Sequence, residues 1–456
     1  MMATFRLLAL SLLSLSVSEA ATPLAAANRP NLILIMADDF GYECVTANGG
    51  QSYKTPNLDR LAADGLRFEN CHVQPLCTPT RVQLMTGRYN IRNYLNFGTL
   101  PRTETTFGQL LKKAGYATGI CGKWQLGHEI DSPQHFGFDK SCLWQQTRRP
   151  PRYTNADLEY NGIEKDFSNG EYGPELVNNF ALAFITENKE KPFFLYYPMI
   201  LTHNPFQPTP DSPEWDPKTD GEDKQQRPKH FADMTAYMDK MIGRIDAKLA
   251  ELGIRDNTLL LFLGDNGTNT GITSRFKDAD YKGGKGSTSA QGTHVPLIAS
   301  WPAMIKEGRV CPDLISSADF LPTLCSAAGV EVPATVDGLS FLPQLRGVVG
   351  TPREWLYTWY SPRQKADLTI RECAFDQHYK LYRDGRLFDI ARDPLEKEPI
   401  PLSDITASVA NASEKLQHVL DQFNNARPAA LDEAFIKSTP VVKPPVKRKG
   451  KGKVKD

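Results

Sequence analysis

The sequence lacks the features that mark several classes of protein. It has no Cys-x-x-Cys motif, which argues against a zinc ribbon or a thioredoxin-like redox site. Internal repeats are absent, and no apolar stretch of about 18 residues follows the N-terminal segment, so we expect no membrane span. The formal net charge is zero, because 53 Lys and Arg balance 53 Asp and Glu. This balance gives no indication of a nucleic-acid partner.

The composition is that of a large globular protein with one uneven charge distribution. The 456 residues are 40% hydrophobic, which supplies a large core and excludes a disordered or fibrous chain. From Lys437 to Asp456 there are eight Lys or Arg and a single acid, so the remainder of the chain is mildly acidic. We expect residues 431–456 to form a basic, disordered tail.

The N-terminus has the pattern of a secretory signal peptide over residues 1–20. Arg6 precedes an apolar run over residues 7–17, and Ser18-Glu19-Ala20 offers a cleavage site between small residues. The alternative is a buried N-terminal helix. We expect export to the periplasm or the extracellular space, which permits disulfides, although most of the eight cysteines fit better as small buried hydrophobic residues.

Short apolar runs alternate with helical patterns through most of the chain. The runs at 31–37, 193–197 and 258–263 are apolar throughout, which is typical of strands buried on both faces of a parallel sheet. Helical patterns at 55–65, 107–114, 176–188 and 231–252 separate them. The sequence therefore predicts an α/β fold with a mainly parallel central sheet flanked by helices.

The pattern changes after about residue 350. Four short runs between residues 355 and 390 have the length and the turns of antiparallel strands, and a helix is expected within 403–424. We therefore expect a catalytic domain over 29–348 and a smaller C-terminal α+β subdomain over 349–430.

Pairs of polar residues follow two of the predicted buried strands. Asp38 and Asp39 follow the first strand, and Asp265 and Asn266 follow the strand at 258–263. Oxygen ligands at the carboxyl ends of parallel strands suit calcium or magnesium better than zinc. Taken alone, either pair fits turn residues better than metal ligands.

The segment Cys77-Thr-Pro-Thr-Arg81 lies between these pairs. Asp-Asp, Cys-x-Pro-x-Arg, Gly-Lys-Trp at 122–124 and Gly-Asp-Asn-Gly at 264–267 follow one another in an order that resembles the type I sulfatase family, over roughly residues 29–400. The resemblance implies an alkaline-phosphatase-like fold. It also implies that a formylglycine-generating enzyme oxidises Cys77 to formylglycine, whose hydrate is the nucleophile. One calcium ion is then expected on Asp38, Asp39, Asp265 and Asn266.

The same resemblance assigns the cationic residues of the site. It implies that Arg81 holds the nucleophile and the metal site, and that Lys123, His203 and Lys285 contact the sulfate. It also makes His203 a candidate acid for the leaving alcohol. Gln125 stands where the family has a histidine that contacts the nucleophile and is its suspected base. Glutamine forms hydrogen bonds but does not take up a proton at neutral pH, so Gln125 is expected to bind substrate only. Ala290 and His294 likewise replace a glutamate and an arginine of the family.

The resulting hypothesis is an exported sulfuric ester hydrolase that acts on a sulfated small molecule or polysaccharide. Loops near 142–175 and 205–230 are expected to select the substrate, and the first loop contains residues that suit a sulfated carbohydrate: Trp144, Arg148, Arg149, Arg152 and Tyr153. One alternative is a phosphodiester or phosphonate monoester hydrolase that uses the same site. The other is a non-catalytic polyanion-binding protein in which Cys77 is never converted.

Overall fold

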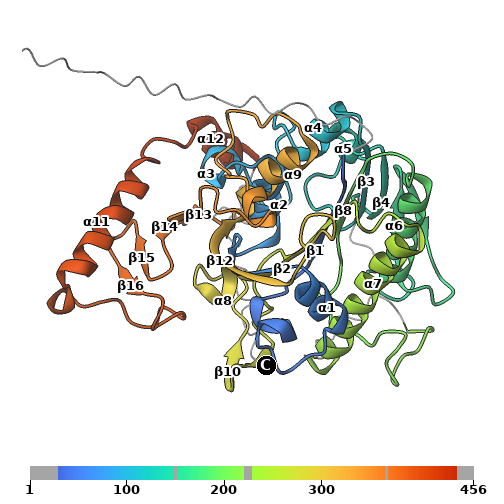
Figure 1. The fold of residues 1–456 in the computed structure, drawn as a ribbon, viewed down its shortest axis with the longest axis horizontal. Helices are drawn as coiled ribbons and strands as arrows, with labels where there is room; N and C mark the ends of the chain where they lie inside the picture. The colour runs from blue at the N-terminus through green and yellow to red at the C-terminus, as the bar shows by residue number, and fades with distance from the viewer. Residues whose placement is uncertain (1–28, 148–150, 220–227, 365–367, 439–456) are drawn as a thin grey trace, which may run out of the picture.

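A ten-stranded sheet forms the centre of the larger part of the molecule (Figure 1). The computed structural model describes residues 29–147, 151–219, 228–364 and 368–438, so the predicted signal peptide, Arg148 and Arg149 of the expected substrate loop, and residues 439–456 lie outside it. In sheet order the strands are Arg309–Ser316 (β12), Leu66–His72 (β2), His294–Ser300 (β11), Thr258–Gly264 (β8), Asn31–Ala37 (β1), Phe193–Pro198 (β7), Ala117–Gly122 (β3), Lys140–Trp144 (β4), Asp157–Tyr160 (β5) and Ile163–Asp166 (β6).

The middle of this sheet is parallel, as the apolar runs predict. β8, β1, β7, β3 and β4 are paired in parallel, and β12 is parallel to β2. β11, β5 and the edge strand β6 are antiparallel to their neighbours. The predicted α/β fold with a mainly parallel sheet is therefore confirmed.

Helices cover both faces of the sheet because both faces of its central strands are apolar. The helices of eight residues or more that pack in these layers are Pro56–Asp64 (α1), Cys77–Thr86 (α2), Gly173–Glu187 (α6), Phe231–Glu251 (α7) and Phe320–Ala328 (α9). Shorter helices are Asn90–Asn93 (α3), Phe107–Lys113 (α4), Ser132–His135 (α5), Ala290–Thr293 (α8) and Leu342–Leu345 (α10).

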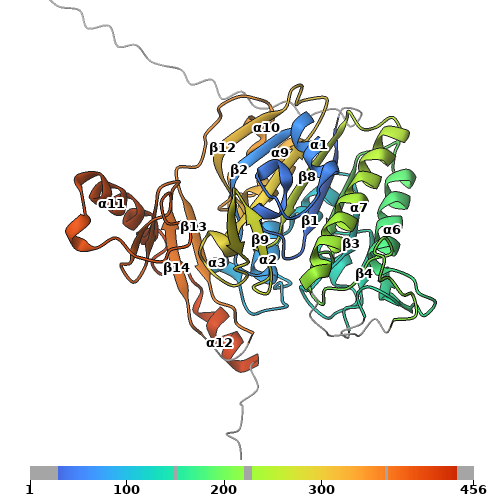
Figure 2. The same cartoon turned by 90° about the horizontal axis from the view of Figure 1, so that it is seen from below.

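Successive residues of β1 point to opposite faces and enter two different cores. Leu32 and Leu34 pack in the core that includes α2, α4 and α9. Ile33 and Ile35 pack in the core that includes α1, α6 and α7. Figure 2 shows α6 and α7 side by side over the second face. The strand ends are thereby held between two packed helical layers.

A small antiparallel sheet forms a separate lobe in the C-terminal part, at the left of Figure 1. Its strands are Leu356–Tyr360 (β13), Arg371–Phe375 (β14), Tyr379–Tyr382 (β15) and Leu387–Asp389 (β16), and helix Ala407–Asp421 (α11) packs against β14 and β15. A two-stranded hairpin of Thr273–Phe276 (β9) and Ala279–Lys282 (β10) lies near the central sheet.

The predicted start of the disordered tail, at residue 431, is wrong, because residues 429–438 form a helix. This helix, Ala429–Ser438 (α12), buries Phe435, whose ring lies 5.0 Å from the Arg363 guanidinium. Asp432 accepts a hydrogen bond of 2.7 Å from the buried Arg363. The apolar contact and the ion pair stabilise a segment whose basic, proline-rich continuation led us to place the boundary too early. The remainder of the predicted tail, 439–456, lies outside the described residues.

Candidate active site

Four neighbouring strands, β8, β1, β7 and β3, end at one edge of the sheet and carry the predicted polar residues there. Asp265-Asn266 follows β8, Asp38-Asp39 follows β1, His203 lies in the loop after β7 and Lys123 follows β3. Ala37 is paired with Gly264, so the two acidic pairs emerge from adjacent strands in register. Open α/β sheets build their ligand sites at this edge.

Two lysines neutralise the first acidic pair. The Lys123 ammonium lies 2.7 Å from Oδ2 of Asp38, and the Lys285 ammonium lies 2.6 Å from Oδ1 of Asp39. Both carboxylates are fully buried. Burial alone raises the pKa of Asp38, but Lys123, His203, Arg81 and Lys285 together hold it well below its usual range. Asp38 is therefore an anion in this site.

Arg81 joins the second acidic pair to the Gly-Lys-Trp loop. Its guanidinium donates to Oδ2 of Asp265 at 3.0 Å and to the carbonyl oxygen of Lys123 at 2.9 Å. Oδ1 of Asp265 accepts the backbone N–H of Asp39 at 3.0 Å. Burial, followed by the neighbouring Asp38 charge, raises the pKa of Asp265. A cation bound beside these carboxylates would oppose that shift.

The donor atoms at the two strand ends fit a hard cation. Oδ1 of Asp38 and Oδ1 of Asn266 are buried, and neither has a hydrogen-bond partner among the described residues. The Asn266 amide nitrogen donates to Oδ1 of Asp39 and to the Gly267 carbonyl, so its oxygen is left for another partner. Two unpartnered oxygens beside further carboxylate oxygens match the donor set of calcium or magnesium.

His203 also approaches this group. It can offer one ligand atom together with Asp38 and Asp39, and the three atoms lie within 4.8 Å of one another. His203 was not predicted as a metal ligand, and Nε2 lies 3.9 Å from Oδ2 of Asp39. Burial lowers the pKa of His203 to about 3, against the opposing effect of Asp38 and Asp39. The imidazole is therefore neutral near neutral pH.

Arg152 determines which nitrogen of that neutral imidazole carries the proton. Its guanidinium contacts Nδ1 of His203, donates to the Asn204 carbonyl at 2.9 Å and lies over the Trp144 ring, 4.0 Å from its centroid. A guanidinium only donates hydrogen bonds, so Nδ1 must accept and Nε2 must carry the hydrogen. The Asn204 carbonyl lies 2.6 Å from Nδ1 and would favour the opposite tautomer, so the assignment rests on the Arg152 contact.

Cys77 is the first residue of α2 and is buried. Lys123, Lys285, Asp265 and Asp38 all act electrostatically on its thiol, which places it beside the charged groups. Burial raises the pKa of the Cys77 thiol despite the two lysines. An unmodified Cys77 is therefore a poor thiolate nucleophile, whereas the helix N-terminus favours an anionic group at this position.

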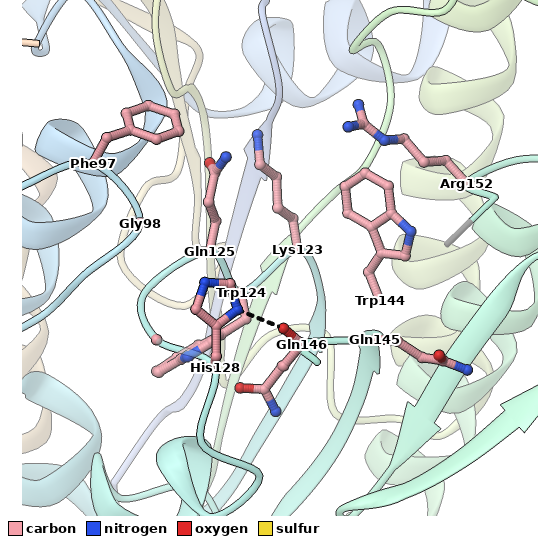
Figure 3. A pocket seen from close by; sticks show the side chains of 11 residues that line it. Phe97, Gly98, Lys123, Trp124, Gln125, His128, Trp144, Gln145, Gln146 and Arg152 are labelled. Atoms are coloured by element: carbon pink, nitrogen blue, oxygen red, sulfur yellow. Dashed lines mark hydrogen bonds between the residues drawn. The ribbon is translucent and has the colours of Figure 1, made fainter. Parts of the chain in front are cut away.

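A cavity of about 290 Å³ opens beside Lys123 (Figure 3). Gln125 lines it and has a left-handed backbone, φ 55°, which is uncommon for a residue other than glycine. Its side-chain oxygen is buried and has no hydrogen-bond partner among the described residues. Phe97, Trp144 and Arg152 also line the cavity. The predicted substrate residue Gln125 thus lies next to the charged site.

All ten predicted site residues gather at this edge of the sheet, while their chemical roles stay predictions. Arg152 and Trp144 belong to a loop that we expected to select substrate, but the contact of Arg152 with His203 was not foreseen. Phe97 and His128 were missed altogether, and Gln146 was covered only by the expected loop near 142–175. They follow no motif, and an aromatic residue or an amide in a loop has the same appearance in a sequence whether or not it lines a cavity.

Comparison with known proteins gives consistent matches. Residues 30–330 match the family model described as Sulfatase, and residues 287–425 match N-sulphoglucosamine sulphohydrolase, C-terminal. Arylsulfatase A of Bos taurus is 33% identical over 406 residues, which is 79% of this chain and 76% of that protein. N-acetylgalactosamine-6-sulfatase of Homo sapiens is 30% identical over 465 residues, which is 87% of this chain and 86% of that protein.

One solved structure among those similar to this chain contains an oligosaccharide. The crystal structure of Ps i-CgsB in complex with k-i-k-neocarrahexaose superposes with a TM-score of 0.71 and 25% identity. The superposition covers 89% of this chain and 99% of that chain.

Proposed function

Since the chain belongs to the sulfatase family, we propose that it hydrolyses the sulfate ester of a carbohydrate with formylglycine at position 77 and one calcium ion. The observation that carries the proposal is the convergence of three buried carboxylates, Asn266 and three cationic side chains beside Cys77. Structural ion pairs alone do not account for the two unpartnered oxygens of Asp38 and Asn266.

Asp38, Asp39, Asp265 and Asn266 are the proposed calcium ligands. The ion would add positive charge where an anionic nucleophile and a sulfate group have to meet. Asp39 has a left-handed backbone, φ 59°, and donates its N–H to Asp265. This conformation orients the Asp39 side chain independently of Asp38, so the adjacent carboxylates do not have to point to opposite faces as in an extended strand.

A formylglycine hydrate at position 77 would supply the oxygen nucleophile that attacks sulfur. Lys123 and Lys285 would hold sulfate oxygens and neutralise charge as the ester bond breaks. His203 would donate a hydrogen bond from Nε2, the nitrogen that Arg152 leaves protonated. Gln125 is proposed to bind substrate, and no proton transfer is assigned to it.

The relatives support a carbohydrate as the substrate. One is named for N-acetylgalactosamine 6-sulfate chemistry, and one structural neighbour contains k-i-k-neocarrahexaose. We also propose maturation by a formylglycine-generating enzyme and export to the periplasm or the extracellular space. The proposed domain division is a catalytic domain over 29–348 and a subdomain from 349 that ends with α12.

The test is mass analysis of the peptide that contains residue 77, combined with elemental analysis and a sulfate-release assay on the same preparation. The proposal predicts a peptide lighter than the cysteine form, about one calcium per chain and turnover of a sulfated sugar. An unmodified Cys77 in protein that binds but does not cleave sulfated polysaccharide would favour the polyanion-binding alternative. Faster cleavage of a phosphodiester than of the matched sulfate ester would favour the phosphoryl alternative.

A further inference from the structure

Lys285 belongs to a glycine-rich loop, residues 283–289, that connects β10 with α8 and has no helix or strand of its own. Gly283, Gly284 and Gly286 surround the lysine. Gly286 has a left-handed backbone, φ 89°, a conformation that favours glycine. Because a glycine backbone is conformationally permissive, contacts with neighbouring segments have to define the position of Lys285.

The active site holds the first half of this loop through the backbone. The N–H of Lys285 donates to the Thr268 carbonyl at 3.0 Å, and the N–H of Gly286 donates to the Pro75 carbonyl at 2.9 Å. Thr268 and Pro75 belong to the segments that carry the second acidic pair and Cys77. These two bonds tie the loop to the active site, but they do not involve its second half.

The C-terminal lobe holds the second half of the loop. The Tyr382 hydroxyl lies 2.8 Å from Oγ1 of Thr288, and the Lys380 ammonium donates to the Thr288 carbonyl. Arg371 donates to the Gly286 carbonyl at 3.3 Å. Tyr382 and Lys380 lie on β15 and Arg371 lies on β14, so two strands of the lobe contact the loop that carries the catalytic lysine.

Glu396 fixes the direction of these hydrogen bonds. Its carboxylate accepts from the Tyr382 hydroxyl at 2.5 Å and from the Lys380 ammonium at 2.8 Å. Because the Tyr382 hydrogen is used there, the Tyr382 oxygen accepts the hydrogen of the Thr288 hydroxyl. The Lys380 and Glu396 side chains are 3% and 7% exposed, so solvent screens this ion pair only weakly. We refer to these four residues as the Thr288 network.

The position of the Lys285 ammonium depends on the position of its backbone. A lysine ammonium is a point charge on a flexible four-carbon stem, and this one lies 2.6 Å from Oδ1 of Asp39. In the proposed reaction it also neutralises the charge that develops on the sulfate. A displacement of about 1 Å at a reacting group can cost about a hundredfold in rate. A shift of the loop would therefore reach the reaction through Lys285.

We propose that the Thr288 network positions Lys285, so that the C-terminal lobe acts on the catalytic step through the loop. Thr288, Lys380, Tyr382 and Glu396 are positioning residues, and Lys285 is the group through which they act. The inference rests on the proposed sulfatase function and adds the residues that hold one of its cations in place.

The test removes single hydroxyl groups and leaves the ion pair of Lys380 and Glu396 in place, because the loss of one charge of a buried pair would destabilise the lobe. With converted, calcium-loaded protein, Thr288→Val and Tyr382→Phe should each lower kcat on 4-nitrophenyl sulfate by about tenfold, which corresponds to about 1.4 kcal/mol. KM should change by less than about twofold, because charge neutralisation matters most in the transition state. Thr288→Ser keeps the hydroxyl and should keep kcat within about twofold of the wild type.

The matched control is Tyr357→Phe in the same lobe. The Tyr357 hydroxyl donates to Glu372 at 2.8 Å, and Glu372 pairs with Arg383, so this group repeats the tyrosine, carboxylate and cation of the Thr288 network. Tyr357 is buried on β13, and this hydrogen bond lies within the lobe. Loss of the Tyr357 hydroxyl should therefore affect the lobe in a similar way and leave kcat unchanged.

Amide hydrogen exchange of a peptide that spans 283–289 follows the loop without any assay of turnover. The loop amides should exchange at least about fivefold faster in Thr288→Val and Tyr382→Phe than in the wild type, because the loop opens more often. Thr288→Ser and Tyr357→Phe should exchange at the wild-type rate.

The outcomes separate this inference from the proposed function. Unchanged exchange in both hydroxyl variants, equal acceleration in Tyr357→Phe, or faster exchange with unaltered kcat would each overturn the positioning role and leave the sulfatase proposal intact. No turnover by converted wild-type protein would overturn the proposed function and the catalytic role of the network with it, whereas exchange would still report whether the lobe orders the loop.

Discussion

The charged groups of the site illustrate how far individual residues could be predicted. Asp38, Asp39, Asp265 and Asn266 were predicted to meet because each pair follows a buried strand, and parallel strands end at a common edge. Arg81 and Lys285 were predicted by resemblance, and they contact the expected carboxylates. The contact between Arg152 and His203 was not predictable, since it joins two loops 51 residues apart and neither loop has periodic structure.

The metal site leads to a prediction for Asp38. Asp38→Ala removes one proposed ligand and leaves the buried Lys123 without its carboxylate. We expect loss of bound calcium and of turnover, together with about 3–5 kcal/mol of stability, because breaking a buried ion pair leaves an uncompensated charge. Elemental analysis and urea unfolding measure these effects, and Asp38→Asn repeats the metal test with a smaller change in shape.

The control for this variant is Asp131→Ala. Asp131 is an exposed acid paired with Arg102, so its removal should keep calcium and activity. Full calcium occupancy in both Asp38 variants would show that the ion is bound elsewhere.

Arg152 leads to a prediction about His203. Arg152→Lys keeps a positive charge but loses the planar group that lies over Trp144 and contacts Nδ1. We expect kcat to fall about tenfold, with a smaller change in KM, because His203 no longer holds its proton on Nε2. Arg102→Lys, at an exposed arginine, is the matched control. A change in KM with kcat unaltered would assign Arg152 to substrate binding instead.

At the scale of elements, the strands that end at the active site could be predicted from the sequence, whereas β2 and β12 could not. β1, β7 and β8 are apolar throughout, whereas β2 alternates buried and half-buried residues and has a charged side chain at Arg67. β12 contains a proline and a register shift, so its sequence does not have the period of a strand. Both strands form through pairing with distant segments, which a local pattern does not encode.

The pairing of β2 with β11 places two histidines opposite each other. His294 is paired with His72, and their rings are stacked with centroids 4.9 Å apart. His294 is the residue that replaces an arginine of the family. Its Nε2 donates to the Glu69 carbonyl at 2.7 Å, and burial lowers its pKa to about 4. Burial and the neighbouring His294 also hold the pKa of His72 well below its usual range.

Because burial lowers the pKa of both histidines, we expect the unfolding free energy to fall as the pH is lowered. Between about pH 4 and 6.5 the unfolded state binds more protons at residue 294 than the folded state does, so stability is fully present above pH 6.5 and falls toward pH 4. The His294 contribution is about 3 kcal/mol. His294→Gln should therefore flatten the dependence of the unfolding free energy on pH, measured in urea. The exposed His418→Gln should leave the slope unchanged, and an equal slope in His294→Gln would contradict the assignment.

At the scale of the whole molecule, two helical layers and a C-terminal lobe lie around the edge of the central sheet that carries the polar site residues. The α/β class and the change to short antiparallel strands after about residue 350 were predictable, because both depend on the order of elements along the chain. The helix α12 was not predictable, since it is stabilised by Arg363 and not by its own sequence period. The remaining basic segment, 439–456, has seven Lys or Arg and one Asp.

Two truncations should therefore behave differently. Deletion of 439–456 should leave kcat on 4-nitrophenyl sulfate unchanged and should raise KM on a sulfated polysaccharide only at low salt, because salt screens such attraction over about 8 Å at physiological ionic strength. Deletion of 429–456 also removes α12 and exposes the partners of Phe435, so it should lower Tm. Thermal unfolding and paired kinetics measure both. Equal Tm values for the two truncations would show that α12 adds no stability.

The central claim is that residue 77 carries the nucleophile of a sulfate ester hydrolase, and the rate of Cys77→Ala tests it most directly. The variant should retain the fold and its calcium, while its turnover of a sulfated sugar should fall below detection. Cys325→Ala, at a buried cysteine of α9, is the matched control and should stay active. More than about a tenth of the wild-type rate in Cys77→Ala, a loss of less than about 1.4 kcal/mol in the barrier, would contradict the account.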